Sequence, residues 1–316
     1  MRNFLPHPKP LFMPSRLLAA HLALFTVALL YGANYSIAKI AMPDPIPPAA
    51  FIMLRVLAAS LLFWITSFWL REKVAKADIF RLAIASAFGV ACNQLLFFKG
   101  LEMTSPISAS LIMLTAPIVV LLFSVFFLGE QLNSLKIIGI VLGVIGAAYL
   151  ILNTGSSAAF KARNPLLGNL LIGGNAVAYS IYLIMIKPLT QKYQAITLLK
   201  WVFLFGCLYV LPFGGPGALA IPYSQLSAEI WAVLAFVLIG VTFLAYLLNA
   251  WALQRLPASV VSSYIYLQPL LAALVAILLA ADELRPALFI SAAFIFSGLF
   301  LISYKKRKPK LQEEAV

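Results

Sequence analysis

Long runs of apolar residues, separated by short polar stretches, follow one another along almost the entire chain. Most runs reach the length of about 20 residues that an α-helix needs to cross the hydrocarbon core of a bilayer. Ten can be distinguished, at residues 17–39, 49–70, 79–98, 105–128, 134–152, 166–187, 196–213, 229–251, 258–280 and 286–304. The pattern predicts an all-α polytopic membrane protein with ten transmembrane helices.

The stretch 101–149 has the same order of features as the stretch 253–301. In both, a polar start leads into an apolar run with a proline inside it, followed by an acidic turn and a second apolar run. This order places Pro117 on Pro269 and Glu130 on Asp282. Identity between the two stretches is near chance, so the order of features indicates a chain that is built twice.

Each half contains five spans, an odd number, so the second half must enter the membrane upside down relative to the first. Inverted repeats are common in secondary transporters, whose substrate site lies near the middle of the bilayer where the repeats meet. We therefore expect two inverted five-helix repeats around a central cavity, at 17–152 and 166–304. The remaining segments are an N-terminal segment at 1–16, a linker at 153–165 and a basic tail at 305–316.

Composition excludes several other classes of protein. With 63% hydrophobic and 10% charged residues and a mean hydropathy of +0.99, the chain is not a soluble globular domain. Its net charge is +13, but the bases stand at the ends of apolar runs, which argues against a nucleic-acid partner. Cys92 and Cys207 lie inside apolar runs, as small buried side chains do. We expect no metal and no cofactor.

The distribution of bases predicts the orientation in the membrane. If the N-terminus is cytoplasmic, sixteen of the 23 lysines and arginines fall on the cytoplasmic side and five on the other, while Arg55 and Lys200 lie within spans. By the positive-inside rule both termini lie in the cytoplasm. We expect a multi-pass protein of a bacterial inner membrane, whose basic tail enforces this topology or binds anionic lipid.

The first two spans and the turn after the fourth carry a more specific signal. Its residues are Tyr31, Gly32, Ala33, Asn34, Tyr35, Lys39, Pro47, Pro48, Phe51, Arg55, Gly129 and Glu130. With them the chain resembles the ten-helix EamA-type branch of the drug/metabolite transporter superfamily over nearly its whole length. It departs from that pattern at Tyr31, where tryptophan is common, and at Asp282, where a second Gly-Glu is expected. The resemblance implies ten helices in two inverted halves and the export or uptake of small metabolites, often amino acids.

Four bases are candidates for a role in transport, because no Asp or Glu lies well inside a span. Lys39 and Lys187 end the first and sixth spans, and Arg55 and Lys200 lie early in the second and seventh. One hypothesis is that they attract a carboxylate or phosphate at the two mouths of the cavity. The alternative is that they extend to the lipid headgroups, since they lie only about 6–9 Å deep. The missing carboxylates argue against an acidic coupling site and against a cationic substrate.

Polar and aromatic residues near the middles of the spans are candidates for substrate contact. Besides the two bases Arg55 and Lys200, they are Asn34, Asn93, Gln94, Tyr179, Tyr182, Tyr246, Asn249, Tyr264, Tyr266 and Gln268. An amide that faced lipid would leave its donors unsatisfied, so these side chains should face the interior. There they either line an amphipathic cavity suited to an amino acid or bond helices to one another.

Two further features have both a functional and a structural interpretation. Pro117 and Pro269 lie in the middle of equivalent spans, where they form either a pair of hinges for alternating access or fixed bends. Gly139, Gly143 and Gly146 give the fifth span a face of small residues, which packs within the chain or against a second copy in a homodimer.

The function we expect is that of a permease, which moves small metabolites by alternating access. The favoured substrates are amino acids or related zwitterionic or anionic compounds, while drug efflux and organic phosphate exchange remain alternatives. A lipid-modifying enzyme is disfavoured because His7 and His21 lie near the N-terminus and no cluster with ligand spacing appears. A signalling or scaffold protein is disfavoured because the chain has no long loops or soluble domain. The partners we expect are a small molecule and membrane lipid.

Overall fold

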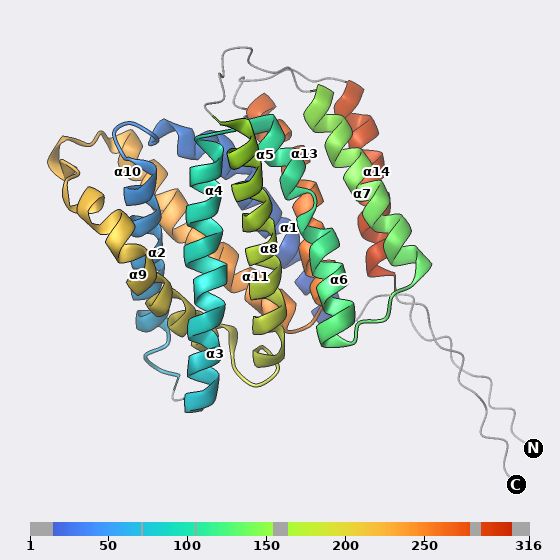
Figure 1. The fold of residues 1–316 in the computed structure, drawn as a ribbon, viewed down its shortest axis with the longest axis horizontal. Coiled ribbons are helices and arrows are strands. Elements are labelled where there is room, and N and C mark those ends of the chain that lie inside the picture. The colour runs from blue at the N-terminus through green and yellow to red at the C-terminus, as the bar shows by residue number, and fades with distance from the viewer. Residues whose placement is uncertain (1–14, 71, 105, 154–163, 279–285, 305–316) are drawn as a thin grey trace, which may run out of the picture.

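The computed structural model describes residues 15–70, 72–104, 106–153, 164–278 and 286–304, in which helices are the one kind of regular element (Figure 1). Ten helical segments in these ranges are long and apolar enough to cross a membrane, which confirms the predicted class. Residues 1–14, most of the linker at 153–165, Asp282 and the basic tail lie outside the described residues.

Five of the ten spans are single α-helices, and they form the less interrupted part of the fold. A sixth, α1, continues into the short η1 (Ala38–Ile40). The helices are α1 (Ser15–Ile37), α2 (Pro48–Thr66), α7 (Ser134–Asn153), α8 (Pro165–Leu189), α9 (Ala195–Leu219) and α14 (Pro286–Ser303). A short 3₁₀ turn, η3 (Tyr223–Gln225), lies between α9 and the next span.

The other four spans are interrupted, and the interruptions occupy corresponding places in the two halves. The third and eighth spans contain π-helical segments, in the series α3 (Lys76–Ser86), η2 (Ala87–Cys92), α4 (Asn93–Leu101) and α10 (Ala228–Ala235), η4 (Phe236–Leu244), α11 (Ala245–Leu253). The fourth and ninth break before their prolines, in the series α5 (Pro106–Met113), α6 (Ala116–Leu128) and α12 (Ala258–Ser263), η5 (Tyr264–Leu267), α13 (Gln268–Leu278). Proline has no backbone N–H to donate to the preceding helical turn. The residues before each proline therefore form a turn or a 3₁₀ segment in place of a regular α-helical turn.

The seventh span is longer than the sequence predicts. The Pro- and Gly-rich stretch was expected to end it near residue 213, but α9 continues to Leu219 through Pro212 and Pro216. Glycine makes this possible, since Gly214 brings α9 against the backbone of Ala49 at the start of α2, where a Cβ would clash. Close packing of this kind holds a proline-containing helix together in a membrane.

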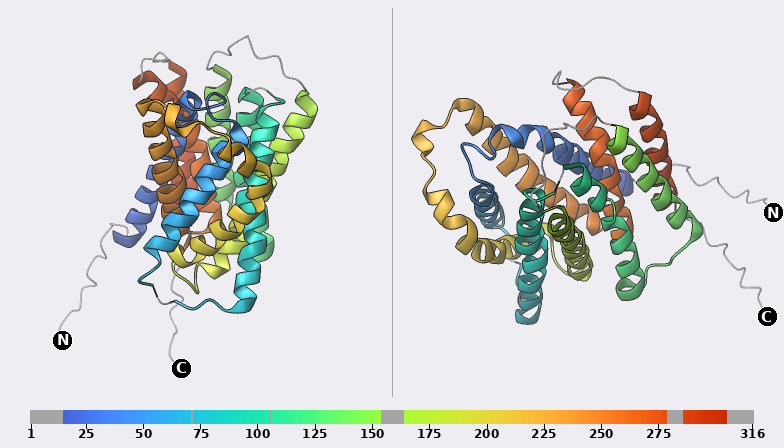
Figure 2. Two further views of the ribbon diagram at one scale, coloured as in Figure 1. Left: turned by 90° about the vertical axis from the view of Figure 1, so that its left-hand side faces the viewer. Right: turned by 45° about the horizontal axis from the view of Figure 1, so that its top comes forward.

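The helix pairs of one half have counterparts in the other. α1 packs against α13 as α8 packs against α6, and α4 packs against α8 as α11 packs against α1. Two pairs join equivalent helices directly, α2 with α9 and α7 with α14. Figure 2 shows from two further sides that the helices run between two opposite faces of the molecule. This pairing agrees with a twofold construction, and the inversion of the halves remains a prediction.

The glycine face of α7 is covered within the chain. Gly139 lies against the backbone of Gly298 on α14, and Gly143 lies against the ring of Tyr266. Figure 1 shows α7 and α14 side by side at one edge of the molecule. The homodimer that this face suggested therefore remains a prediction, and it would need another surface.

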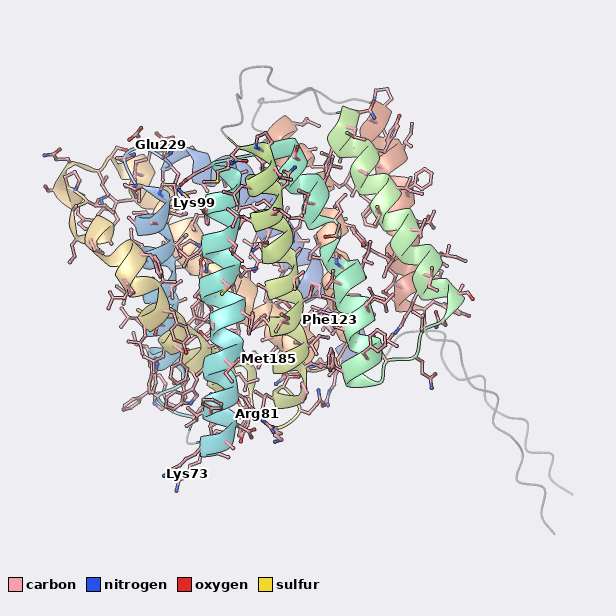
Figure 3. The ribbon with its side chains drawn as sticks, in the orientation of Figure 1. Lys73, Arg81, Lys99, Phe123, Met185 and Glu229 are labelled. Carbon is pink, nitrogen blue, oxygen red and sulfur yellow. The ribbon has the colours of Figure 1, made fainter. Side chains whose placement is uncertain are left out.

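Charged and apolar side chains are distributed as a bilayer requires. Figure 3 shows Lys73 and Arg81 at one end of the molecule, Lys99 and Glu229 at the other, and Phe123 and Met185 between them. Large apolar side chains such as Phe126, 78% exposed, point outward from the helices. Because lipid is as apolar as these side chains, their exposure carries no penalty in a membrane.

Candidate functional site

A cavity with a volume of about 470 Å³ is lined by side chains from both halves of the chain. Ten of the twelve residues proposed from the sequence for substrate contact line it. They are Asn34, Arg55, Asn93, Gln94, Tyr179, Tyr182, Tyr246, Asn249, Tyr264 and Gln268. Pro269 lines it as well. The polar residues near the span middles are thus brought together at one place.

Arg55 supplies the positive charge of this cavity. Its side chain is only 8% exposed, and its Nε donates a hydrogen bond to the Thr242 hydroxyl at 3.0 Å. Tyr31 and Tyr246 lie within electrostatic range of the guanidinium. No Asp or Glu occurs among the described residues that line the cavity. Arg55 therefore does not extend to the lipid headgroups, and it has no carboxylate partner among the described residues of the cavity lining.

The π-helix η4 explains why Thr242 can hold Arg55. Thr242 donates its hydroxyl hydrogen to the carbonyl of Val237, five residues earlier, at 2.8 Å. With that hydrogen engaged, the hydroxyl oxygen is oriented to accept from Arg55. A π-helical turn in a transmembrane helix is frequently found at a functional site, where it redirects a side chain. The forked end of the guanidinium is thereby left for other acceptors.

Amide groups make up a second part of the cavity wall. The Asn175 Nδ2 donates to the backbone carbonyl of Asn93. The remaining oxygen of Asn175, the side-chain oxygen of Asn34 and both amide atoms of Gln94 have no partner among the described protein atoms. Buried amide groups usually have partners, so these four atoms are an unsatisfied polar part of the cavity wall.

Aromatic rings make up a third part. Tyr179, Tyr182 and Tyr246 line the cavity, together with Asn249. Tyr246 packs edge-on against Phe203, with ring centroids 4.9 Å apart. Phe97 and Phe98 add apolar rings on α4. A cavity that combines one cation, several amides and aromatic rings can hold a small molecule with an anionic group and an apolar part.

Two of the predicted candidates lie outside this cavity. Lys200 is buried and its Nζ lies over the Trp64 ring, 5.2 Å from the centroid, which is a cation–π contact. Tyr266 is fully buried against Gly143. Lys39 lies in η1, and its side chain is outside the described residues. The symmetrical arrangement of bases that the sequence suggested is thus not seen for Arg55 and Lys200.

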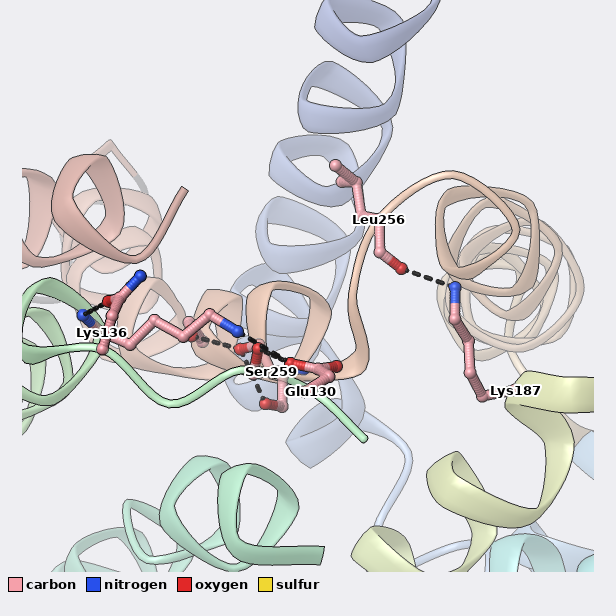
Figure 4. Close-up of polar contacts among 8 residues, drawn as sticks. Glu130, Lys136, Lys187, Leu256 and Ser259 are labelled. Carbon is pink, nitrogen blue, oxygen red and sulfur yellow. Dashed lines mark hydrogen bonds and ion pairs between the residues drawn. The ribbon is translucent and has the colours of Figure 1, made fainter. Parts of the chain in front are cut away.

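Polar contacts tie the two halves together on one face of the molecule, which we call the link face. It contains the α2–α3, α6–α7, α8–α9 and α11–α12 links. Glu130 in the α6–α7 link accepts from the Ser259 hydroxyl at 2.5 Å and from Lys136 at 3.0 Å (Figure 4). It also accepts from the backbone N–H of Ser259, near the N-terminus of α12. Glu130 therefore fixes the start of the ninth span to the end of the fourth.

Lys187 fixes the other end of the α11–α12 link. Its Nζ donates to the carbonyls of Leu253 and Leu256, the latter at 2.8 Å (Figure 4). The Leu253 carbonyl belongs to the last residue of α11 and the Leu256 carbonyl lies just beyond it, at a helix C-terminus where a cation is favourable. Because Leu253 also lines the cavity, Glu130 and Lys187 together hold a segment that begins at the cavity wall and lies on the link face.

Several important residues were not among the sequence candidates. Tyr31 and Asn175 line the cavity, and Thr242 orients Arg55. Tyr31 belongs to the motif of the first span that carries the family resemblance. Asn175 is an amide in the middle of the sixth span, so the expectation that such amides face the interior applies to Asn175 as well. Thr242 had no such signal. Among the described residues no group of His, Cys, Asp and Glu has the geometry of a metal site.

Comparison with known proteins gives a consistent result. The EamA-like transporter family matches residues 18–152 and 166–304. The uncharacterized transporter YetK of Bacillus subtilis is 26% identical over 313 residues, covering 98% of this chain and 94% of its own. An uncharacterized transporter of Archaeoglobus fulgidus is 25% identical over 292 residues, covering 91% and 98%.

More distant similarities extend to a plant and to a solved structure. A WAT1-related protein of Arabidopsis thaliana is 23% identical over 320 residues and covers 89% of this chain and 84% of its own. One crystal structure has the same fold, with a TM-score of 0.74 and 19% identity, over 90% of this chain and 96% of that one.

Proposed function

Since the chain belongs to the EamA-like transporter family, and is therefore a membrane transporter and not an enzyme, we propose that it carries a small zwitterionic or anionic metabolite, with amino acids as the favoured class. The substrate binds in the central cavity, and the two halves expose it to one face of the membrane and then to the other. The single observation that carries this proposal is Arg55, a buried cation in a cavity whose described lining contains no carboxylate.

The argument from Arg55 rests on the cost of burying charge. An ion removed from water costs several kcal/mol unless a partner compensates it. Thr242 satisfies one donor of the guanidinium, and the neighbouring phenols Tyr31 and Tyr246 are neutral at physiological pH. A carboxylate on the substrate would supply the missing negative charge and accept two parallel hydrogen bonds from the guanidinium.

The rest of the cavity suits the remainder of an amino acid. An α-ammonium group needs acceptors, and the side-chain oxygens of Asn34, Gln94 and Asn175 have no partner within the described part of the chain. An apolar side chain needs a nonpolar surface, and Tyr182, Phe97 and Phe98 provide it. The volume of about 470 Å³ lies within the range of pockets for small ligands and leaves room for one such molecule.

Alternating access has structural support at the link face and in the interrupted helices. The breaks before Pro117 and Pro269 lie in equivalent spans, and the segment held by Glu130 and Lys187 begins at Leu253, which lines the cavity. We propose that this segment moves when the cavity opens toward the link face. By the distribution of bases, the link face is cytoplasmic in a bacterial inner membrane.

The alternatives make different demands on the cavity. A cationic drug would place its charge near Arg55 without a carboxylate to offset it. An organic phosphate carries up to two charges, and sites for such groups usually contain several bases, whereas Arg55 is the one Lys or Arg among the described residues of the cavity lining. An amino acid fits this set of groups better than either.

A ligand-binding assay tests the proposal. The detergent-purified full-length protein is heated with L-phenylalanine, L-leucine, their methyl esters, glycerol 3-phosphate or a cationic dye. A ligand that binds the folded state at about a hundred times its Kd adds about 2.7 kcal/mol to stability. We expect the two amino acids to raise Tm and the esters, which lack the carboxylate, to fail. Stabilisation by the dye alone would overturn the proposal, and stabilisation by glycerol 3-phosphate alone would favour phosphate exchange.

A further inference from the structure

The one histidine among the described residues contacts a residue of the cavity wall. His21 lies on α1, six residues after the helix begins at Ser15. Its Nδ1 is 2.8 Å from the hydroxyl oxygen of Tyr264, and the two ring centroids are 6.1 Å apart. At 1.5 Å per residue, His21 lies about 9 Å along the helix from its first residue. The imidazole is therefore inside the membrane-spanning part of the chain.

The pair joins the cavity to a group outside it. Tyr264 lines the cavity, whereas His21 does not. Tyr264 belongs to η5, the 3₁₀ segment that breaks the ninth span just before Pro269. His21 borders the exposed stripe of α1 formed by Leu18, Leu22 and Phe25, and its own side chain is partly exposed. His21 is thus in direct contact with a wall residue at a break in a helix.

No carboxylate faces His21 from the described elements that pack against α1. These are η1, η4, α11, η5 and α13. Their titratable or charged residues are Lys39 on η1, Tyr246 on α11, and Tyr264 and Tyr266 on η5, while η4 and α13 have none. On α1 itself, besides His21, they are Arg16, Tyr31 and Tyr35, and Arg255 lies in the link after α11. His21 is therefore not locked in its charged form by an ion pair.

Histidine is the side chain whose ordinary pKa lies nearest neutrality. The acidic residues of the described spans stand at span ends, as Asp78 and Glu229 do in the first turns of α3 and α10. Carboxylates deep in spans are the usual proton carriers of transporters. His21 is the described group inside a span that is best suited to take up and release a proton at cellular pH.

We propose that His21 is a proton-binding site whose occupancy is transmitted to the cavity through Tyr264. A neutral imidazole either accepts the Tyr264 hydroxyl hydrogen at Nδ1 or donates its own hydrogen to the hydroxyl oxygen, according to the tautomer. A protonated imidazole donates from both nitrogens, so the hydroxyl oxygen must accept from Nδ1 and the hydroxyl hydrogen must find another acceptor. One proton is taken from water on one face and returned on the other, and no other bond changes.

This proposal differs from a purely structural role in what it predicts for proton flux. The full-length protein is reconstituted in liposomes that contain a pH-sensitive dye, and a mixture of the twenty standard amino acids is added outside. We expect the wild-type lumen to change pH during amino-acid movement. In His21→Gln, which keeps a polar side chain of similar reach, we expect exchange of labelled amino acids to continue while the pH change is lost. Amino-acid movement without a pH change in the wild type, or an undiminished pH change in His21→Gln, would refute the proposal.

A second measurement needs no substrate and separates this proposal from the proposed function. In a His7→Gln background, His21 is the one histidine of the chain, and ¹⁵N-histidine labelling reports its protonation. We expect the signal to titrate, and Tyr264→Phe to move the midpoint by about half a pH unit or more, because a hydrogen bond is lost. A signal that does not titrate, or a midpoint that is unchanged in Tyr264→Phe, would refute the proposal even if no amino acid binds.

Discussion

Arg55 on α2 and Thr242 on η4 are joined by a buried hydrogen bond of 3.0 Å between residues from opposite halves of the chain. The bond uses Nε, which leaves the forked end of the guanidinium for a ligand in the cavity. Thr242 is itself fixed by its bond to the Val237 carbonyl. The orientation of the Arg55 guanidinium in the cavity thus depends on a π-helical turn in the eighth span.

A first prediction concerns this bond. Thr242→Val keeps the shape of the side chain but removes the hydroxyl, so Arg55 loses its fixed orientation. A hydrogen bond to a charged group is worth about 1.5–3 kcal/mol, so we expect amino-acid binding to weaken at least about tenfold. Thr242→Ser retains the hydroxyl and should bind as the wild type does. Isothermal titration of the three proteins with L-phenylalanine measures the effect, and equal affinity in all three would show that Thr242 does not orient Arg55.

A second prediction concerns the packing of α7 against its neighbours. A Cβ at Gly143 would overlap the ring of Tyr266, so Gly143→Ala should destabilise the protein by about 1–3 kcal/mol. Gly173 on α8 has no atom within 4 Å of the position of an added Cβ, so Gly173→Ala is the matched control and should leave stability unchanged or raise it. Thermal unfolding in detergent compares the two. A loss of stability in Gly173→Ala equal to that in Gly143→Ala would contradict this packing.

A third prediction concerns the closure of the link face. Glu130→Gln removes the charge that pairs with Lys136 and weakens the bond to Ser259, two contacts that are largely shielded from solvent. We expect α12 to separate from the α6–α7 link more often. A cysteine introduced by Val261→Cys, with Cys92 and Cys207 replaced by serine, should then react faster with a water-soluble maleimide. Glu102→Gln is the control, because its pair with Lys99 is exposed and lies within one helix end.

For this third prediction, the labelling rates decide the outcome. If Glu130→Gln and Glu102→Gln leave the rate at residue 261 equally unchanged, Glu130 does not hold the segment closed. If the rate rises in both, the effect belongs to surface charge in general. A rise in Glu130→Gln alone supports the closure described here.

Much of the fold was predictable because the bilayer imposes a simple rule on the sequence. Each apolar run of about 20 residues had to become a helix, since no other open segment satisfies its backbone in lipid. The same rule identified the amides of the cavity, such as Asn34 and Gln94, which lipid cannot solvate. The extension of α9 through Pro212 was missed because the compensating contact, Gly214 against α2, joins residues far apart in the sequence.

The arrangement around Arg55 was only partly predictable. Sequence position placed Arg55 and Lys200 at equivalent depths, but depth does not fix the direction of a side chain around the helix axis. In the structure Arg55 points into the cavity and Lys200 lies over Trp64. The role of Thr242 was not predictable because it depends on the π-helix η4. A π-helical turn changes which side chains face the cavity, and the hydropathy of the sequence does not reveal it.

The central claim is that Arg55 binds the carboxylate of an amino-acid substrate, and counterflow uptake tests it most directly. Proteoliposomes loaded with unlabelled L-phenylalanine and L-leucine are given trace labelled amino acid, with wild type, Arg55→Gln and Lys200→Gln compared at equal amounts of folded protein. We expect uptake by the wild type and by Lys200→Gln, and a loss of at least about tenfold in Arg55→Gln, since one charge-assisted bidentate contact is removed. Undiminished uptake by folded Arg55→Gln would contradict the claim.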